Sequence, residues 1–445
     1  MPGLFPRPWW LAWVLFAGAA QAEPDAAWRR QLHQSHADAG RAVAQAQAAA
    51  ATEAERNRAW RQALQWQDLY GRQAELAALV HEIAPRAELA DERLLYQARV
   101  DMASGRHAEA ARTLEPLRRK FVRLPDGDLR RELRLTLAEL DLRLGQPEEA
   151  TRELNRIADG ARQAGEPELA ARAFNLLGTV QLEMFDYAAG LGYHEQALRL
   201  APEWAVQTRE RARMGIAQMH NMLGNRAEAF ALLDAAQAGF QRTQNLRAEA
   251  DALLLRGFFL HRSGQAVAAL EPYRQALALR EQLGSEADIV NALTHLCATL
   301  SDVKRLGEAL SVCERATRMA EATDSQSLRW DAYWISAEAQ AAAGDYRLAY
   351  EHQQRSTEAL RKHAKLTLIS LTGAMRERFD AERQRLDNER LALQLSGEQG
   401  EREQLRRVAW GLGLLVVALA VALAWRLPWR PRARAQASLN STSAA

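Results

Sequence analysis

The sequence of 445 residues has few cysteines, prolines and aromatic residues. Its two cysteines are too few for a disulfide-stapled framework or a four-thiolate zinc site. Aromatic residues make up 7%, 13 residues are proline, and the Asn-Gly and Asp-Gly pairs of tight hairpins are rare, which argues against a β-sandwich, a barrel or a doubly wound sheet. Ala, Leu, Arg, Glu and Gln dominate instead. This composition predicts an all-α protein.

A large excess of charge is also absent. The 58 basic and 56 acidic residues leave a formal charge of +2, so binding to a nucleic-acid backbone is not expected. The phosphate-binding pattern G-x-x-x-x-G-K-[ST], the zinc-protease pattern H-E-x-x-H and the serine-hydrolase pattern G-x-S-x-G do not occur. We therefore expect that the protein is not an enzyme and binds no cofactor. His33 and His36 could share a helix face and bind a metal, but a solvated face is the favoured interpretation, and no metal is expected.

Residues 1–22 have the pattern of a secretory signal peptide. Arg7 supplies a positive charge, Trp9–Ala20 is an apolar stretch of 12 residues, and Ala20-Gln21-Ala22 is a small-x-small cleavage site. The alternative is a short anchoring helix that is never cut. Because 12 residues are too short to span a bilayer, cleavage before Glu23 is favoured.

A second apolar segment, Val408–Trp425, contains 18 residues without a charge and predicts a transmembrane helix. The segment after it is rich in arginine, so residues 426–445 are expected to form a short cytoplasmic tail. Both apolar segments then place the bulk of the chain in the periplasm, held at a bacterial inner membrane by one C-terminal helix.

A turn residue followed five positions later by a small residue recurs through the exported part. Successive starts differ by 40, 40, 39, 40, 40 and 40 residues, a period that predicts a solenoid of supersecondary units. An eighth pair, Gly71…Leu76, lies 34 residues before the first. The seven main pairs are Gly105…Ala110, Gly145…Ala150, Phe185…Gly190, Gly224…Ala229, Gly264…Ala269, Lys304…Ala309 and Gly344…Ala349.

The turn segments Gly224-Asn225-Arg226-Ala227-Glu228-Ala229 and Gly344-Asp345-Tyr346-Arg347-Leu348-Ala349 resemble the turn of the tetratricopeptide repeat. The resemblance implies a superhelix of about eight helical hairpins over residues 57–369, with units starting near residues 57, 91, 131, 171, 210, 250, 290 and 330. Residues 23–56 are helix-prone and are expected to form capping helices.

Residues 370–407 lack the turn pairs and are expected to form a helical spacer. Phe379, Leu386 and Leu393 recur every seven positions, which fits either a dimeric coiled coil, and so a homodimer, or a single solvated helix. The order of parts resembles the extracytoplasmic input half of bacterial membrane diguanylate cyclases and of some histidine kinases. No G-G-[DE]-E-F segment or kinase motif follows, so the resemblance implies an input module without its catalytic domain.

The concave face of such a solenoid is lined by the first helix of each unit and is expected to bind a protein or peptide partner. The expected function is therefore a periplasmic binding or sensory input module; the alternative is a non-signalling scaffold for cell-envelope or secretion assembly. The candidate binding residues are Arg99, Glu139, Asn175, Gln218, Asn221, Phe258, His261, Thr294 and Trp334.

The two cysteines fall in the two helices of one expected unit. Cys297 and Cys313 lie where other units place facing residues across the hairpin. In an oxidising compartment they could form a disulfide, and the alternative is two buried thiols that fill small-residue positions.

Overall fold

The computed structural model describes residues 27–124, 127–323, 325–365, 411–419 and 421, and within them it is helical with no strand. Residues 27–34 and 346–365 are helical, and two short 3-10 helices cover Ala87–Leu89 and Phe121–Arg123. The remaining helices are α2 (His36–Ala49), α3 (Glu53–Leu69), α4 (Gln73–Glu82), α5 (Ala90–Ala103), α6 (His107–Lys120), α7 (Asp128–Arg143), α8 (Pro147–Gln163), α9 (Pro167–Glu183), α10 (Tyr187–Leu200), α11 (Val206–Leu223), α12 (Arg226–Arg242), α13 (Leu246–Arg262), α14 (Ala266–Leu283), α15 (Glu286–Asp302), α16 (Leu306–Ala322) and α17 (Gln326–Ala342).

Several predicted segments lie outside the described residues. These are the signal peptide at 1–22, the spacer at 370–407 and the tail at 426–445. The predicted transmembrane segment is described only in part, where residues 411–419 are helical. Across the described chain, no helix is both long and apolar enough to cross a bilayer.

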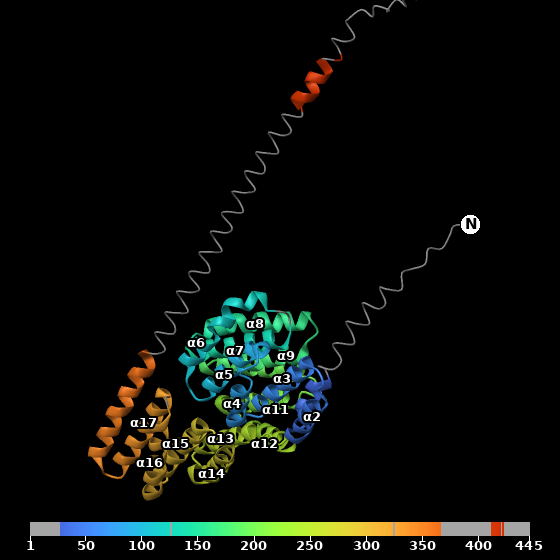
Figure 1. The fold of residues 1–445 in the computed structure, drawn as a ribbon. Helices are drawn as coiled ribbons and strands as arrows, with labels where there is room; N and C mark the ends of the chain where they lie inside the picture. Colours follow the sequence, from blue (N-terminus) through green and yellow to red (C-terminus); the bar gives the residue numbers. More distant parts are fainter. Residues whose placement is uncertain (1–26, 125–126, 324, 366–410, 420, 422–445) are drawn as a thin grey trace, which may run out of the picture. The chain divides into compact units, whose positions relative to one another are not determined.

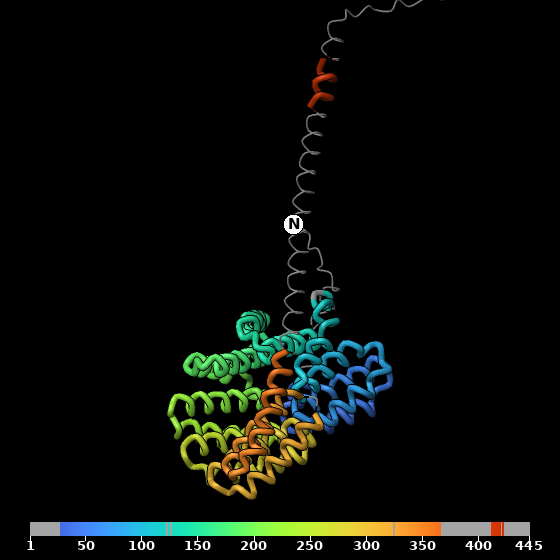
Figure 2. The backbone as a smooth tube through the Cα atoms, turned by 90° about the vertical axis from the view of Figure 1, so that its left-hand side faces the viewer, coloured from blue at the N-terminus to red at the C-terminus, as the bar shows by residue number. Residues whose placement is uncertain are grey.

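Consecutive helices pair into hairpins that stack on one another. The pairs run from α3–α4 through α15–α16, and α17 pairs with the helical residues 346–365. Each first helix also packs on the first helix of the next hairpin, as α7 does on α9 and α9 on α11. Figure 2 shows the hairpins following one another around the superhelix, from the blue N-terminal helices through green to orange. The fold is an all-α, tetratricopeptide-like solenoid.

The repeated turn pairs of the sequence mark the hairpin corners. The glycines of five of the seven main pairs adopt positive φ between the two helices, and the small residue five positions later is buried where the helices meet. Phe185 and Lys304 occupy the same corner positions, each with a φ of 61°. The backbone at these two residues is in the left-handed conformation, which glycine adopts without a steric penalty.

The superhelix closes because its N-terminal helices reach the turn between α12 and α13 (Figure 1). The backbone N–H of His36 donates to the carbonyl of Thr243 at 2.9 Å, and the Asn245 side chain donates to the carbonyl of Leu69 at 3.3 Å. A Cβ atom on Gly71, which has a φ of 66°, would lie 1.9 Å from the Cδ atom of Arg247. These contacts join segments at least 176 residues apart in the sequence and bring the N-terminal helices against the start of α13.

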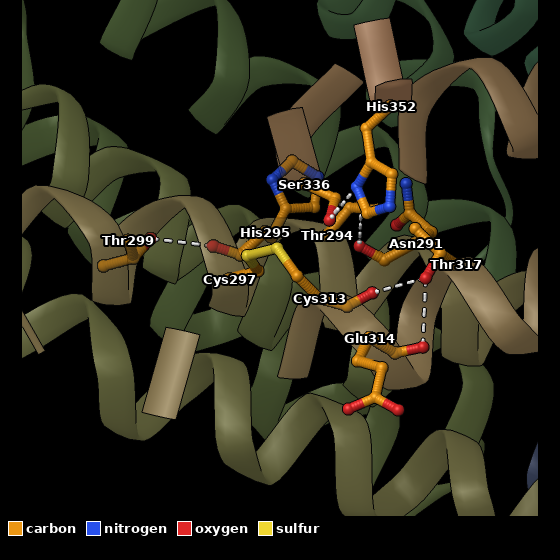
Figure 3. The surroundings of a disulfide bond; sticks show 10 residues. All are labelled: Asn291, Thr294, His295, Cys297, Thr299, Cys313, Glu314, Thr317, Ser336 and His352. Carbon is orange, nitrogen blue, oxygen red and sulfur yellow. Dashed lines mark hydrogen bonds between the residues drawn. A yellow bond between two sulfur atoms is a disulfide. The ribbon is translucent and has the colours of Figure 1, made fainter. Parts of the chain in front are cut away.

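A disulfide joins Cys297 in α15 to Cys313 in α16, with their Cα atoms 5.5 Å apart (Figure 3). Both residues are buried between the two helices of one hairpin. Thr299 and Thr317 donate to backbone carbonyls within their own helices beside it. In the chain-entropy account, closing a loop between residues 16 positions apart raises the free energy of unfolding by about 3 kcal/mol.

Replacing Lys304 by glycine should stabilise the protein. Lys304 is exposed and left-handed, so Lys304→Gly removes steric strain without removing packing, and we expect the unfolding free energy to rise by about 1 kcal/mol. The measurement is urea unfolding followed by circular dichroism. Lys304→Ala is the matched control, because it removes the charge and keeps the Cβ atom; an equal gain from alanine would contradict the prediction.

The disulfide predicts no free thiol in the oxidised protein. After unfolding in denaturant without reductant, the full chain should take up no maleimide label, and it should take up two labels after reduction, because it contains only two cysteines. Mass spectrometry of the labelled protein gives the count. Two labels without reductant would show that Cys297 and Cys313 are buried thiols.

Candidate functional site

The first helices enclose two cavities that meet at shared residues. The first cavity, of about 190 Å³, lies between the helical residues 27–34 and helices α3, α5, α7, α9 and α11. The second, of about 360 Å³, is bounded mainly by α5, α7, α13 and α15. Asp68, Arg99 and Glu139 line both cavities. The inner face of the superhelix is therefore a continuous hollow whose wall is rich in charged side chains.

Most of the charged side chains on this wall form ion pairs, several of them between neighbouring hairpins. The Arg172 guanidinium donates twice to Glu132, with one contact at 2.7 Å, and Arg99 donates to Asp68 at 2.7 Å. Burial alone would raise the pKa of Glu132, but the charge and the hydrogen bond of Arg172, with the charges of Arg99 and Arg29, together outweigh burial and lower that pKa to about 2. The carboxylate is thus held ionised inside the superhelix.

The N-terminal helical residues complete the wall of the first cavity. Arg29 forms an ion pair with Asp128, at the start of α7. His33 is buried, and its ring forms a T-shaped contact with that of Trp204, the ring centroids being 5.5 Å apart. Burial, together with the charges of Arg172 and Arg211, lowers the pKa of His33 to about 3. A segment expected only to cap the solenoid therefore contributes directly to its inner surface.

Two charged groups on the cavity wall stand apart from these pairs. Within the described residues, neither Arg211 in α11 nor Glu139 in α7 has an ion pair or a side-chain hydrogen bond. The Arg211 side chain is open to solvent from the cavity, although the superhelix surrounds it. Arg211 and Glu139 act on one another electrostatically without touching.

Three of the nine candidate residues line these cavities. Arg99 and Glu139 face both, and Asn175 faces the first. The Asn175 amide donates to the carbonyl of Thr208 at 3.1 Å, and its oxygen lies 3.2 Å from His194 Nδ1. Asn175 therefore links α9 to both helices that follow it.

The other six candidates line neither cavity. Asn221 is buried, and Phe258 packs against Phe259. His261 Nε2 lies 2.7 Å from Asp302 Oδ2. Thr294 donates to the carbonyl of Asn291 within its own helix, Trp334 is 43% exposed, and Gln218 is half-buried. The structure brings none of these six together with Arg99 or Glu139 at either cavity.

A column of polar residues that sequence reasoning missed follows the same period. Its members differ in position by 40, 39, 40, 40 and 40 residues and occupy equivalent places in six successive first helices. The first three members line the first cavity, and the fourth, Asp251, forms an ion pair with Arg280. A polar residue recurring at the repeat period would have signalled this column. It consists of Glu132, Arg172, Arg211, Asp251, Asn291 and Asp331.

The interpretation of His33 and His36 as one solvated helix face is wrong. Ser35 separates the two residues and caps α2, which begins at His36. His33 is buried, and the His36 ring packs between those of Trp66 and Tyr70. In the part of the chain that the structure describes, no three His, Cys, Asp or Glu side chains gather as metal ligands would.

The sequence matches no family model and no curated protein. Among solved structures, the Cut9–Hcn1 hetero-tetramer of APC/C is similar, with a TM-score of 0.52 at 14% identity over 76% of this chain and 60% of that chain. A Rap protein complexed with competence and sporulation factor matches with a TM-score of 0.45 at 14% identity, over 69% of this chain and 97% of that chain. NprR in complex with its cognate peptide NprX matches with a TM-score of 0.41 at 13% identity, over 64% of this chain and 82% of that chain.

These likenesses concern the fold alone. The chain is a tetratricopeptide-like helical repeat protein. The resemblance to diguanylate cyclase input regions gains no support from them.

Four histidines with lowered pKa values, two of them buried and two half-buried, predict a loss of stability in mild acid. Burial lowers the pKa of His33 to about 3 and those of His107, His194 and His295 to about 4. Unfolded histidines bind protons below about pH 6.5, so the unfolded state takes up more protons than the folded state between pH 6.5 and pH 4. Each buried histidine should cost about 1.4 kcal/mol of stability per pH unit across that range.

Denaturant unfolding at pH 7, 6 and 5 measures this slope. His295→Phe is the test variant, because the His295 ring stacks on Tyr273 and phenylalanine keeps that contact without titrating. The variant should lose less stability than the wild type on going from pH 7 to pH 5. A wild-type unfolding free energy that is unchanged over this range would contradict the assignment.

Proposed function

We propose that this protein binds a short peptide, or a terminal segment of a partner protein, inside its superhelix. The observation that carries the proposal is the hollow formed by the two cavities, which Asp68, Arg99 and Glu139 connect. Tetratricopeptide-like solenoids offer their concave face to extended partners, and the first helices form that face here.

The size and lining of the hollow support a segment rather than a folded domain. Its two parts measure about 190 and 360 Å³, and only together do they fall well within the range of about 300 to 1,000 Å³ for sites that enclose a small ligand or a few residues of peptide. Leu135, Leu169 and Leu176 supply apolar wall beside the charged groups of the first cavity. Such a wall can receive apolar side chains while polar groups orient the peptide backbone.

We further propose that binding occurs in the periplasm and serves a sensory input role. The signal pattern at 1–22 and the apolar segment at 408–425 support this placement. The Cys297–Cys313 disulfide supports it as well, since disulfides persist in oxidising compartments. In this proposal the spacer at 370–407 passes occupancy of the superhelix toward the membrane.

Filling the first cavity should abolish peptide binding. The detergent-solubilised full chain is equilibrated with a pool of random hexapeptides, and mass spectrometry identifies those that it retains. Leu176→Trp places a larger side chain at the cavity wall and should remove the retained peptides.

Leu223→Trp is the matched control, because Leu223 ends α11, is 44% exposed and lines neither cavity. It should retain the same peptides as the wild type. The proposal fails if the wild type retains no peptide, or if Leu176→Trp retains the wild-type set.

A further inference from the structure

The last hairpin of the solenoid exposes large side chains at positions that are buried in earlier hairpins. Its second helix, residues 346–365, is drawn in orange in Figure 2. Tyr350 is 64% exposed, whereas Leu270, at the equivalent place in α14, is 2% exposed. Leu360 is 39% exposed, whereas Phe240, at the equivalent place in α12, is completely buried. The face on which earlier hairpins stack the next one is therefore not covered by described residues at this end.

Two further positions show the same contrast. Gln353 is exposed, whereas Tyr273 and Cys313, at the equivalent places in α14 and α16, are buried. In α17, Trp334 is 43% exposed, whereas Thr294, at the equivalent place in α15, is 7% exposed. Large side chains left uncovered on a packing face indicate a surface that another helix covers.

The described chain does not turn back over this face. The second helices α14 and α16 end at Leu283 and Ala322, and a short turn leads from each to the next first helix. The last helix passes the positions equivalent to these ends and is still helical at Lys365. Within the described residues, the next first helix that each earlier hairpin receives from its own chain is therefore not supplied.

The exposed side of the last helix is an uncharged stripe on an otherwise highly charged helix. Arg347, Glu351 and Glu358 lie beside this stripe, and none lies on it. Steps of three or four residues keep its members on one helix face. A two-fold axis places each residue of such a stripe opposite its own copy, so an uncharged stripe can pair with itself without repulsion. This end stripe consists of Tyr346, Tyr350, Gln353, Thr357, Leu360 and Ala364.

The sequence continues the end stripe into the predicted spacer. After Ala364, apolar residues follow at steps of three or four, and the heptad positions of the spacer come next. Such steps correspond to one face of an α-helix. A coiled coil between two spacers would therefore bring two end stripes together in the same direction. The apolar residues are Leu368, Leu371, Met375 and Phe379.

We propose that the end stripe is a dimer interface, where the last helices of two copies of this chain pack side by side in parallel. The second copy covers the face that the next hairpin covers elsewhere in the solenoid. Tyr350 and Leu360 pack against their counterparts across the two-fold axis. Dimer contact thus begins on the solenoid itself rather than in the spacer alone, and this proposal does not depend on peptide binding.

Cysteine crosslinking of the detergent-solubilised full chain tests the contact. The two native cysteines are joined in a buried disulfide, so an introduced cysteine is the one free thiol. Under mild oxidation, Tyr350→Cys and Leu360→Cys should form a disulfide-linked dimer on non-reducing gels. Glu358→Cys is the matched control, because Glu358 is exposed on the same helix beside the stripe. It should crosslink at least about 10-fold more slowly.

A charge placed on the stripe should weaken the dimer. Tyr350→Glu sets a carboxylate opposite its own copy, so the dissociation constant of the dimer should rise about 10-fold or more. Analytical ultracentrifugation in detergent measures that constant. Val267→Glu is the control: Val267 is 73% exposed on α14, away from the last hairpin, and the variant should dimerise like the wild type.

Two results would overturn the assignment. Equal crosslinking rates for the two stripe cysteines and Glu358→Cys would mean that the spacer alone holds the dimer. A monomeric wild type without crosslinks at Tyr350→Cys or Leu360→Cys would mean that the chain's own residues or a different protein cover the face. Neither result concerns the retention of peptides, so this proposal and the proposed function fail separately.

Discussion

The contact between the N-terminal helices and the turn before α13 determines how charged side chains can be held on the inner face of this superhelix. An open solenoid leaves its concave face in water, where charged side chains need no partner. Here the hydrogen bonds from His36 to Thr243 and from Asn245 to Leu69 bring the wall of one turn against the next. The inner faces of the first helices are then enclosed, and each charge on them must be paired or held at a cost.

The ion pairs follow from this enclosure and tie the hairpins to their neighbours. Arg172 and Glu132 belong to successive first helices, as do Arg99 and Asp68. In most solenoids stability is a sum of unit and nearest-neighbour terms. The N-terminal contact adds a link between distant units, so the first cavity forms only when helices from five hairpins and the residues 27–34 are all in place. Arg211 and Glu139, which have no ion-pair partner among the described residues, both lie on the wall of that cavity.

Part of the site was predictable because it follows the repeat. Arg99, Glu139 and Asn175 were chosen from their place in the first helices, and the cavities contain them. Gln218, Phe258 and Thr294 were chosen in the same way, yet they lie elsewhere. The difference arises because α11, α13 and α15 contribute only their first two turns to the cavities, and the three candidates lie farther along these helices. Arg172 and Arg211 could have been found from their period, whereas His33 belongs to no repeat.

The sequence by itself determined the helical hairpins and their corners, because a left-handed turn residue and a small residue five positions later act within one unit. Phe185 and Lys304 keep the same left-handed corner where glycine is missing. Only the tertiary structure decided that the solenoid closes, that residues 27–34 line its interior and that Arg211 is left unpaired. These features depend on contacts between segments more than 170 residues apart in the sequence, which no local pattern encodes.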